Sequence, residues 1–280
     1  MLPKWREKFS PDVVIANIEN IAHGKGIGIS QVNELRPPTG GGVDIFTGGN
    51  HSVEGKDAGK ILDDETIPIL RPANMSPNVP GRGVLVYTLG SHFPPRSRLT
   101  LKGSDASHDS KNARQEVSLL VINLIGQVNM RHNYDSPFHA IDKILAEWGD
   151  KTSYKILDWH ADATSEKEVM GWYLDGKVSA VFGTHTHVPT ADAKILPKGT
   201  AYISDIGMVG PHHSIIGVEV EPAFKRFRDQ IQSPMEVVES GPIEVNAIYL
   251  ELENKLAARS EFRRAVDIRH LREIIQEGIM

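Results

Sequence analysis

The stretch "VSAVFGTHTHVPTAD" (residues 178–192) joins a short apolar run to two histidines that lie one residue apart. The run is rich in β-branched and aromatic residues, which predicts a buried strand ending near Gly183. In an extended segment residues i and i+2 project to the same side, so we expect His185 and His187 to point at one spot. Two imidazoles placed together at a strand end are typical of a metal site.

Similar apolar runs recur along the whole chain. They predict strands at 12–18, 42–48, 83–89, 117–125, 154–160, 178–184, 200–207 and 245–253. The clearest helical pattern covers 135–149, with Asp135 or Ser136 as its N-cap. Its apolar stripe consists of Ile141, Ile144, Leu145 and Trp148. This mixture predicts an α/β fold whose sheets are covered by helices, with catalytic groups at strand ends.

The length and composition are those of an ordinary globular protein. The chain has 280 residues, of which 40% are hydrophobic and 24% charged. We find no internal repeat and no clean linker, so we expect a single domain over 1–280. The polar stretch 91–115 is expected to be an inserted surface hairpin or loop. The last segment, 255–278, fits either a helix or a final hairpin.

Charge and cysteine content exclude several classes of function. The formal net charge of -5 provides no basic field that would hold a nucleic-acid duplex, although a small nucleotide in a pocket is compatible with it. The absence of cysteine excludes disulfides, thiolate metal sites and cysteine nucleophiles. The charged start "MLPKWREKFSPD" and the short apolar run at 117–128 indicate neither export nor membrane insertion, so the cytoplasm is the expected location.

Further polar side chains follow other predicted strands. His160 ends the strand at 154–160, Glu19 and Asn20 follow the strand at 12–18, and Asn50 and His51 follow the strand at 42–48. A carboxylate can bridge two cations, an amide oxygen adds a neutral ligand, and a neighbouring histidine can protonate a leaving oxygen. Asn50 and His51 taken alone are better explained as a turn. In combination these residues indicate a hydrolytic metal site.

A resemblance to a known family rests on four stretches: "IENIAHGKG", "GGNHS", "DWHADATSEK" and the whole of 171–211. The chain resembles the bacterial calcineurin-like metallophosphoesterases of the YmdB type, which hydrolyse 2',3'-cyclic nucleotides, in the same order from about residue 1 to about residue 253. The resemblance implies an α/β/β/α sandwich that binds two divalent metal ions, with Fe or Mn expected and Zn as the alternative. It implies a small phosphodiester as the substrate, and self-association is left open.

The same resemblance assigns a role to each side chain of the site. Six of them would hold the metals: Glu19 both ions, Asn20 and His187 the first, and Asn50, His160 and His185 the second. His51 would be the general acid that protonates the departing 2' oxygen after attack by a metal-activated water. Candidates for orienting the ligands are Asp158, Asp162, Thr184 and Thr186, which are equally explained as strand-end hydrogen bonds.

The start of the sequence departs from the family pattern. Family members open with a strand that ends in Gly-Asp and whose aspartate holds the first metal, but Glu19 comes too early here for such a strand. Asp12 stands at the wrong end of the strand at 12–18 to replace it. Two explanations remain open: the start codon is placed too late, or the first strand is missing and the site is weakened or holds a single metal.

Two other functions are considered beside the phosphodiesterase. A regulatory or binding protein on the same fold, catalytically impaired because the first ligand aspartate is absent, is the main alternative. An amidohydrolase or a lactamase-like hydrolase fits poorly, because His187 is followed by Val-Pro-Thr and the histidine pair lies far from the chain start.

Overall fold

The computed structural model describes residues 1–37, 42–89, 117–254 and 262–276. The expected insertion at 91–115 lies outside these residues. A six-stranded sheet has the order β3-β4-β5-β6-β8-β7. Its parallel strands are β4 (Ser118–Ile125), β5 (Tyr154–His160), β6 (Ala180–Thr184) and β8 (Ala201–Ile203). The edge strands β3 (Val84–Thr88) and β7 (Lys194–Ile195) run antiparallel to their neighbours.

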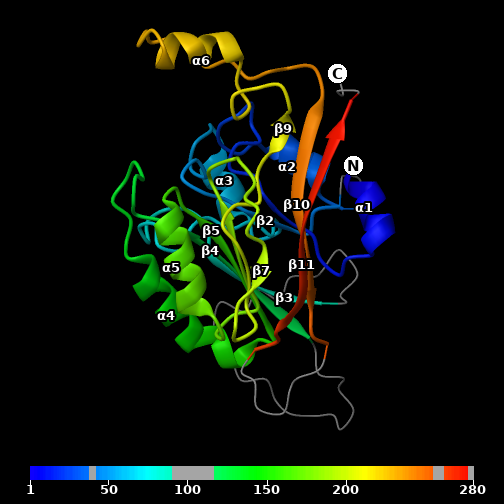
Figure 1. Cartoon of the computed structure of the whole chain (residues 1–280). Coiled ribbons are helices and arrows are strands. Elements are labelled where there is room, and N and C mark those ends of the chain that lie inside the picture. The colour runs from blue at the N-terminus through cyan, green and yellow to red at the C-terminus, as the bar shows by residue number, and fades with distance from the viewer. Residues whose placement is uncertain (38–41, 90–116, 255–261, 277–280) are drawn as a thin grey trace.

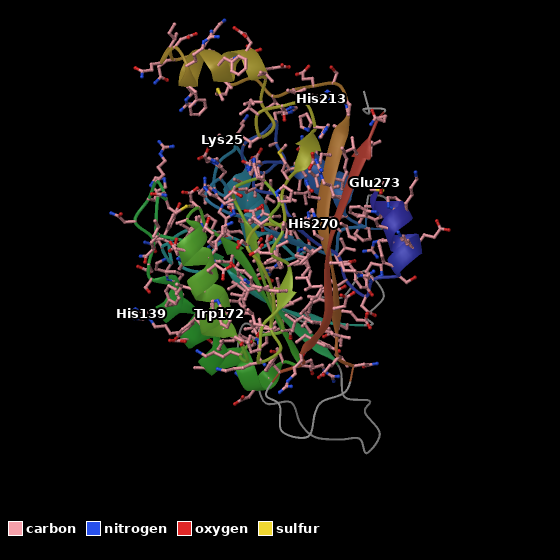
Figure 2. All side chains as sticks on the ribbon, in the orientation of Figure 1. Lys25, His139, Trp172, His213, His270 and Glu273 are labelled. Carbon is pink, nitrogen blue, oxygen red and sulfur yellow. The ribbon has the colours of Figure 1, made fainter. Side chains whose placement is uncertain are left out.

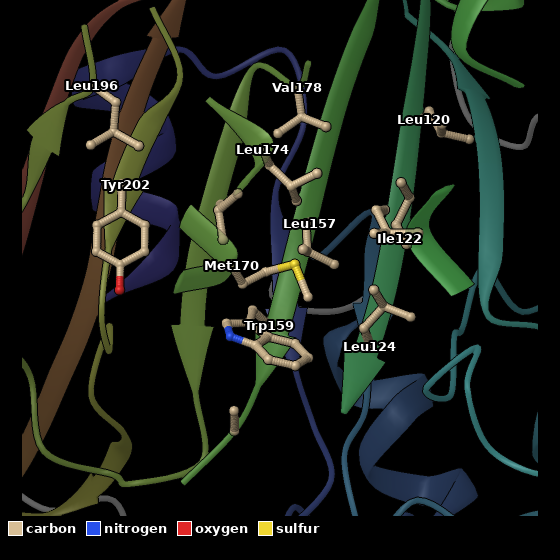
Figure 3. Packing of buried hydrophobic residues seen from close by; sticks show 13 residues of the cluster. Leu120, Ile122, Leu124, Leu157, Trp159, Met170, Leu174, Val178, Leu196 and Tyr202 are labelled. Carbon is tan, nitrogen blue, oxygen red and sulfur yellow. The ribbon is translucent and has the colours of Figure 1, made fainter. Parts of the chain in front are cut away.

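Helices cover one face of this sheet. They are α4 (Pro137–Trp148), the 3₁₀ turn η1 (Gly149–Lys151) and α5 (Thr164–Leu174). The Ser136 side chain caps α4 by accepting a hydrogen bond from the His139 amide, as predicted. Ile141 of α4 and Met170 of α5 are fully buried in the same cluster as Trp159 of β5, and Figure 3 shows Met170 beside Trp159. The apolar stripe predicted for 135–149 therefore faces the core.

A second sheet covers the opposite face. Its strands are β9 (Val209–Pro211), β10 (Ile243–Leu252) and β11 (Ala265–Ile275), all antiparallel. Ile248 and Leu250 of β10 pack against the first sheet, whereas the intervening Tyr249 contacts Phe9 of α1 (Leu2–Phe9), with ring centroids 5.1 Å apart. The layers are thus helix, sheet, sheet and helix (Figure 1). The predicted α/β/β/α sandwich is confirmed, and β11, within the described part of the last segment, pairs antiparallel with β10, as the hairpin alternative expects.

A small parallel pair lies beside the large sheet. It consists of β1 (Ile15–Asn17) and β2 (Ile45–Thr47), packed with α2 (Ile29–Leu35) and α3 (Ala58–Asp63). Asn17 and Thr47 both donate to the Asp158 carboxylate at the end region of β5. The carboxyl ends of β1, β2 and β5 therefore meet. Within the described part of the chain β1 pairs only with β2, and Asp12 precedes β1 whereas Glu19 follows it.

One helix stands apart from these layers. α6 (Val220–Phe227) projects from the molecule beyond β9, at the same end as the carboxyl ends of the parallel strands (Figure 1). Among the described residues, no helix is both long enough and apolar enough to cross a membrane.

Candidate metal centre

Three predicted ligands meet at the carboxyl ends of the strands. Glu19 follows β1, His160 is the last residue of β5, and His185 directly follows β6. One ligand atom from each lies within 4.8 Å of the other two. His160 Nε2 is 3.2 Å from Glu19 Oε1 and 3.1 Å from His185 Nδ1. A carboxylate and two imidazoles at these separations can surround one cation.

Asn50 completes this group. Its Oδ1 lies 2.9 Å from His160 Nε2. The preceding Gly49 makes the approach possible, because a Cβ there would stand 2.2 Å from Glu19 Oε2 and 2.3 Å from His160 Nε2. Any side chain at Gly49 would therefore push the ligands apart. The predicted second set, Asn50, His160 and His185, is brought together beside Glu19.

Asn20 and His187 lie next to the same carboxylate. Asn20 Nδ2 is 3.2 Å from Glu19 Oε1 and 3.3 Å from His187 Nε2. Asn20 Oδ1 is buried and has no hydrogen-bond partner among the described residues. A buried amide oxygen without a partner is unusual, and a cation is a group that would satisfy it. The donor set thus fits metal ions on two separate observations: the clustered ligands and this orphaned oxygen.

The predicted extended geometry of 185–187 is wrong. His185 has φ 102° and His187 has φ 68°, so the chain turns through left-handed conformations that non-glycine residues rarely adopt. The two rings consequently contact different neighbours. His185 contacts His160, whereas His187 contacts Asn20, and both of these neighbours approach Glu19 Oε1.

The charges suit metal binding at neutral pH. Burial by itself raises the pKa of Glu19, but His160 and hydrogen bonds from His160 and the His51 amide outweigh it and hold the pKa at about 2. Burial, followed by the neighbouring His160, lowers the pKa of His185 to about 4. Glu19 is therefore ionised and His185 neutral, which are the forms that bind metals.

A buried relay orients His160. Thr184 Oγ1 donates to Asp158 Oδ1 at 2.7 Å and lies 2.9 Å from His160 Nδ1. Because the hydroxyl proton is directed at the carboxylate, His160 Nδ1 is the donor to Thr184, which leaves Nε2 as the ring nitrogen that would exchange its proton for a metal ion. Asp158 and Thr184 thus take the orienting role considered for them.

The other two orienting candidates differ. Asp162 Oδ1 lies 3.8 Å from His185 Nε2, which is too far for a hydrogen bond that would orient the ring. Thr186 contributes its backbone amide, which donates to Asp205 Oδ2 at 3.1 Å, rather than a contact from its side chain to a ligand.

His51 is held on two sides. Its backbone amide donates to Glu19 Oε2 at 3.1 Å, and its Nδ1 lies 2.9 Å from Glu54 Oε1. Lys25 Nζ in turn lies 2.7 Å from Glu54 Oε2. Sequence reasoning missed Glu54, although its position three residues after His51 was the available signal.

Tyr134 is a further residue that sequence reasoning missed. Its hydroxyl is buried without a hydrogen-bond partner in the described part of the chain. Burial, followed by the charges of Glu19 and Glu54, raises the pKa of Tyr134, so the phenol stays protonated and able to donate. No pattern in the loop "RHNYDSP" (131–137) indicates this role.

Comparison with known proteins assigns the family. The profile of the YmdB-like protein family matches residues 1–94 and 98–264. The chain belongs to the YmdB-like family. A relative from Bacillus subtilis (strain 168), a 2',3'-cyclic-nucleotide 2'-phosphodiesterase, is 37% identical over 255 residues, covering 91% of this chain and 84% of the relative. A putative phosphatase/phosphodiesterase from Mycoplasma pneumoniae is 30% identical over 97% of this chain and 89% of its own length.

Solved structures agree with the YmdB-like assignment. A hypothetical protein from Thermus thermophilus superposes with a TM-score of 0.78 at 36% identity, covering 99% of this chain and 92% of that one. A structure described as a novel phosphatase from Mycoplasma pneumoniae also gives 0.78, at 28% identity, with 99% of this chain and 87% of that one covered. The metallophosphoesterase fold expected from the resemblance is confirmed.

Proposed function

We propose that this chain is a metal-dependent phosphodiesterase that opens 2',3'-cyclic nucleotides at the 2' bond. The observation that carries the proposal is the Glu19, His160 and His185 group, with the orphaned Asn20 Oδ1 beside it. A YmdB-like chain with this fold is a hydrolase of the metallophosphoesterase kind. The cyclic-nucleotide substrate is suggested by the Bacillus subtilis relative.

Two divalent ions, Fe or Mn, fit the nitrogen and oxygen donors. Glu19, Asn20 and His187 would hold one ion, and Asn50, His160 and His185 would hold the other together with Glu19. When bound, the ions would supply Lewis acidity, activation of a water molecule and neutralisation of phosphoryl charge.

His51 is the general acid in this proposal. Glu54 is an acceptor only, so His51 Nδ1 donates to it, and this contact fixes the orientation of the ring. The other ring nitrogen, Nε2, then delivers a proton to the 2' oxygen as its bond to phosphorus breaks. Water supplies the new oxygen on phosphorus, and the product is the nucleoside 3'-phosphate.

Tyr134 would bind the substrate. Its protonated and otherwise unpartnered hydroxyl can donate to a phosphoryl oxygen or to a ribose oxygen. Unlike an ionised group, a neutral phenol adds no repulsion toward an anionic substrate.

Turnover of 2',3'-cyclic AMP by the purified chain in Mn²⁺ or Fe²⁺ tests the proposal. We expect metal-dependent formation of 3'-AMP, which separates cleavage at the 2' bond from cleavage at the 3' bond. His51→Ala should lower kcat by about a hundredfold or more, since general acid catalysis typically contributes that much. His139→Ala, at an exposed position of α4 (Figure 2), is the matched control and should retain activity.

The binding-protein alternative has one observation in its favour. Within the described residues the first set contains three side chains, Glu19, Asn20 and His187, and β1 pairs only with β2. Binding of Mn²⁺ and of 2',3'-cyclic AMP without metal-dependent turnover would support this alternative and contradict the proposed activity.

A further inference from the structure

A buried ion pair lies beneath the turn that carries His185 and His187. Lys167 of α5 and Asp205, which follows β8, have their charged atoms 2.7 Å apart, and each side chain is 2% exposed. A buried ion pair is weak evidence for stability, because desolvation of the two charges offsets much of their attraction. Its contacts indicate another role.

The ion pair hydrogen-bonds to the backbone on both sides of His185. Lys167 Nζ donates to the Thr184 carbonyl oxygen at 2.7 Å, and the Thr186 amide donates to Asp205 Oδ2 at 3.1 Å. The carbonyl before His185 and the amide after it are therefore both bound by the same ion pair. Asp205 is fixed in turn, since its Oδ1 accepts from the Gly207 amide at 2.9 Å.

The turn at residues 184–187 has a backbone conformation that other contacts must stabilise. Both histidines have positive φ, and such residues remain in this region only where the surroundings over-determine it. Two backbone hydrogen bonds, Ile206 amide to Gly183 oxygen and Met208 amide to His187 oxygen, each 3.0 Å long, attach the turn to the segment after β8. The ion pair ties this assembly to α5.

The backbone under the turn is closely packed around Gly183. A Cβ at Gly183 would stand 1.7 Å from the Ser204 oxygen and 3.2 Å from Lys167 Nζ. A side chain at position 183 would therefore collide with the Ser204 backbone and would also crowd the lysine ammonium.

We propose that Lys167 and Asp205 are positioning residues of the metal centre. They hold the turn 184–187 so that His185 Nδ1 faces His160 and His187 Nε2 faces Asn20. This proposal rests on the proposed function, which makes both histidines metal ligands. Unlike the Thr184 hydroxyl, which orients a ring, the ion pair acts on the backbone that presents the rings.

The test uses Lys167→Met and the double variant Lys167→Met with Asp205→Leu in the full chain. Mn²⁺ binding is measured by calorimetric titration, and exchange of the Thr186 amide by NMR. Lys167→Met should weaken Mn²⁺ binding at least tenfold and speed the exchange of the Thr186 amide. The double variant no longer buries a lone carboxylate, so it should unfold at a higher temperature than Lys167→Met while its Mn²⁺ affinity stays weak.

Two matched controls separate positioning from loss of stability. Met170→Ala removes a fully buried core side chain from the same helix, and Lys194→Met removes the partly exposed ion pair with Glu168 of α5. Both should bind Mn²⁺ with wild-type affinity. A wild-type Mn²⁺ affinity together with a protected Thr186 amide, in either variant that lacks Lys167, would overturn the proposal.

A failure of the proposed function would give a different experimental result from a failure of the positioning role. If the wild-type chain bound no Mn²⁺, the metal site itself would be contradicted. The exchange of the Thr186 amide would then still decide whether the ion pair holds the turn.

Discussion

At the scale of single residues, Asp158 determines how His160 is presented. Its fully buried carboxylate accepts hydrogen bonds from Asn17, Thr47 and Thr184, which come from three different strands. One side chain thus ties together β1, β2 and β6 and fixes the tautomer of a ligand on its own strand β5.

Asp158→Asn should destabilise the chain and weaken metal binding. The amide keeps only one acceptor oxygen and turns an NH₂ group toward groups that donate, so we expect a loss of about 1–3 kcal/mol in the free energy of unfolding. Urea unfolding in the presence of a chelator measures the loss without a contribution from metal. Asp142→Asn, whose carboxylate is an exposed acceptor for Tyr173, is the control. Equal stability of the two variants would refute the relay.

Glu54 is the residue whose replacement tests how His51 works. Glu54→Gln keeps the size of the side chain but replaces the carboxylate that accepts from His51 Nδ1 with a weaker, neutral acceptor. We expect kcat to fall about tenfold or more with a smaller change in KM, because the ring acts mainly in the transition state. Lys25→Met leaves the pair of Glu54 and His51 in place and should change kcat much less. An unchanged kcat in Glu54→Gln would show that the pair of His51 and Glu54 takes no part in the mechanism.

At the scale of secondary structure elements, the second sheet carries a charged cluster across its three strands. Glu244 of β10 lies 2.9 Å from Arg272 of β11, and 2.7 Å from His212, which directly follows β9. The hydrogen bond from Arg272, supported by those from His212 and Asn246, lowers the pKa of Glu244 to about 2.

The lowered pKa predicts how this sheet responds to acid. Because the folded-state pKa lies below the ordinary value of 4.5, the stabilisation is fully present above about pH 4.5 and is lost as the pH falls toward 2. Glu244→Gln should therefore cost about 1 kcal/mol at pH 6 and much less at pH 2.5, a modest figure because Arg272 is half-exposed. Chemical unfolding at both pH values measures this, with Glu251→Gln on the same strand as the control. A cost independent of pH would contradict the assignment.

At the scale of the whole molecule, the site joins segments far apart in the chain. Glu19, His160 and His185 follow β1, β5 and β6, which belong to two separate sheets. A cation held between them binds only the folded chain, so it links the stability of both sheets.

Metal should therefore raise the thermal stability of the chain. At a free Mn²⁺ concentration about a hundredfold above the Kd, binding adds about 2.7 kcal/mol to the free energy of unfolding. For a chain of this size we expect Tm to rise by roughly 5 °C or more, and a chelator to reverse the rise. Differential scanning calorimetry measures it, with His185→Ala as the variant that should lose most of the shift. An equal shift in His185→Ala would place the bound metal elsewhere.

The sequence by itself determined the buried strands and the polar side chains that stand at their ends. The runs at 117–125 and 154–160 predicted β4 and β5 almost to the residue, because a strand buried on both faces is apolar along its whole length. The motifs around Glu19, Asn50 and His160 were sufficient to indicate the family and the metal chemistry. All these signals are local, since they depend on neighbours in the chain.

Only the tertiary structure decided how the site is supported. Lys167 and Asp205 are 38 residues apart, and a lysine in a helix sequence is ordinarily read as part of a solvated face. The left-handed turn at His185 and His187 also had no local signal, because non-glycine residues adopt it only when distant groups hold them. Glu54 and Tyr134 lie in loops, and only the folding of these loops places them at the site. Contacts between segments that are distant in the chain produce no periodic pattern in the sequence. These parts of the site could therefore be found only from the three-dimensional structure.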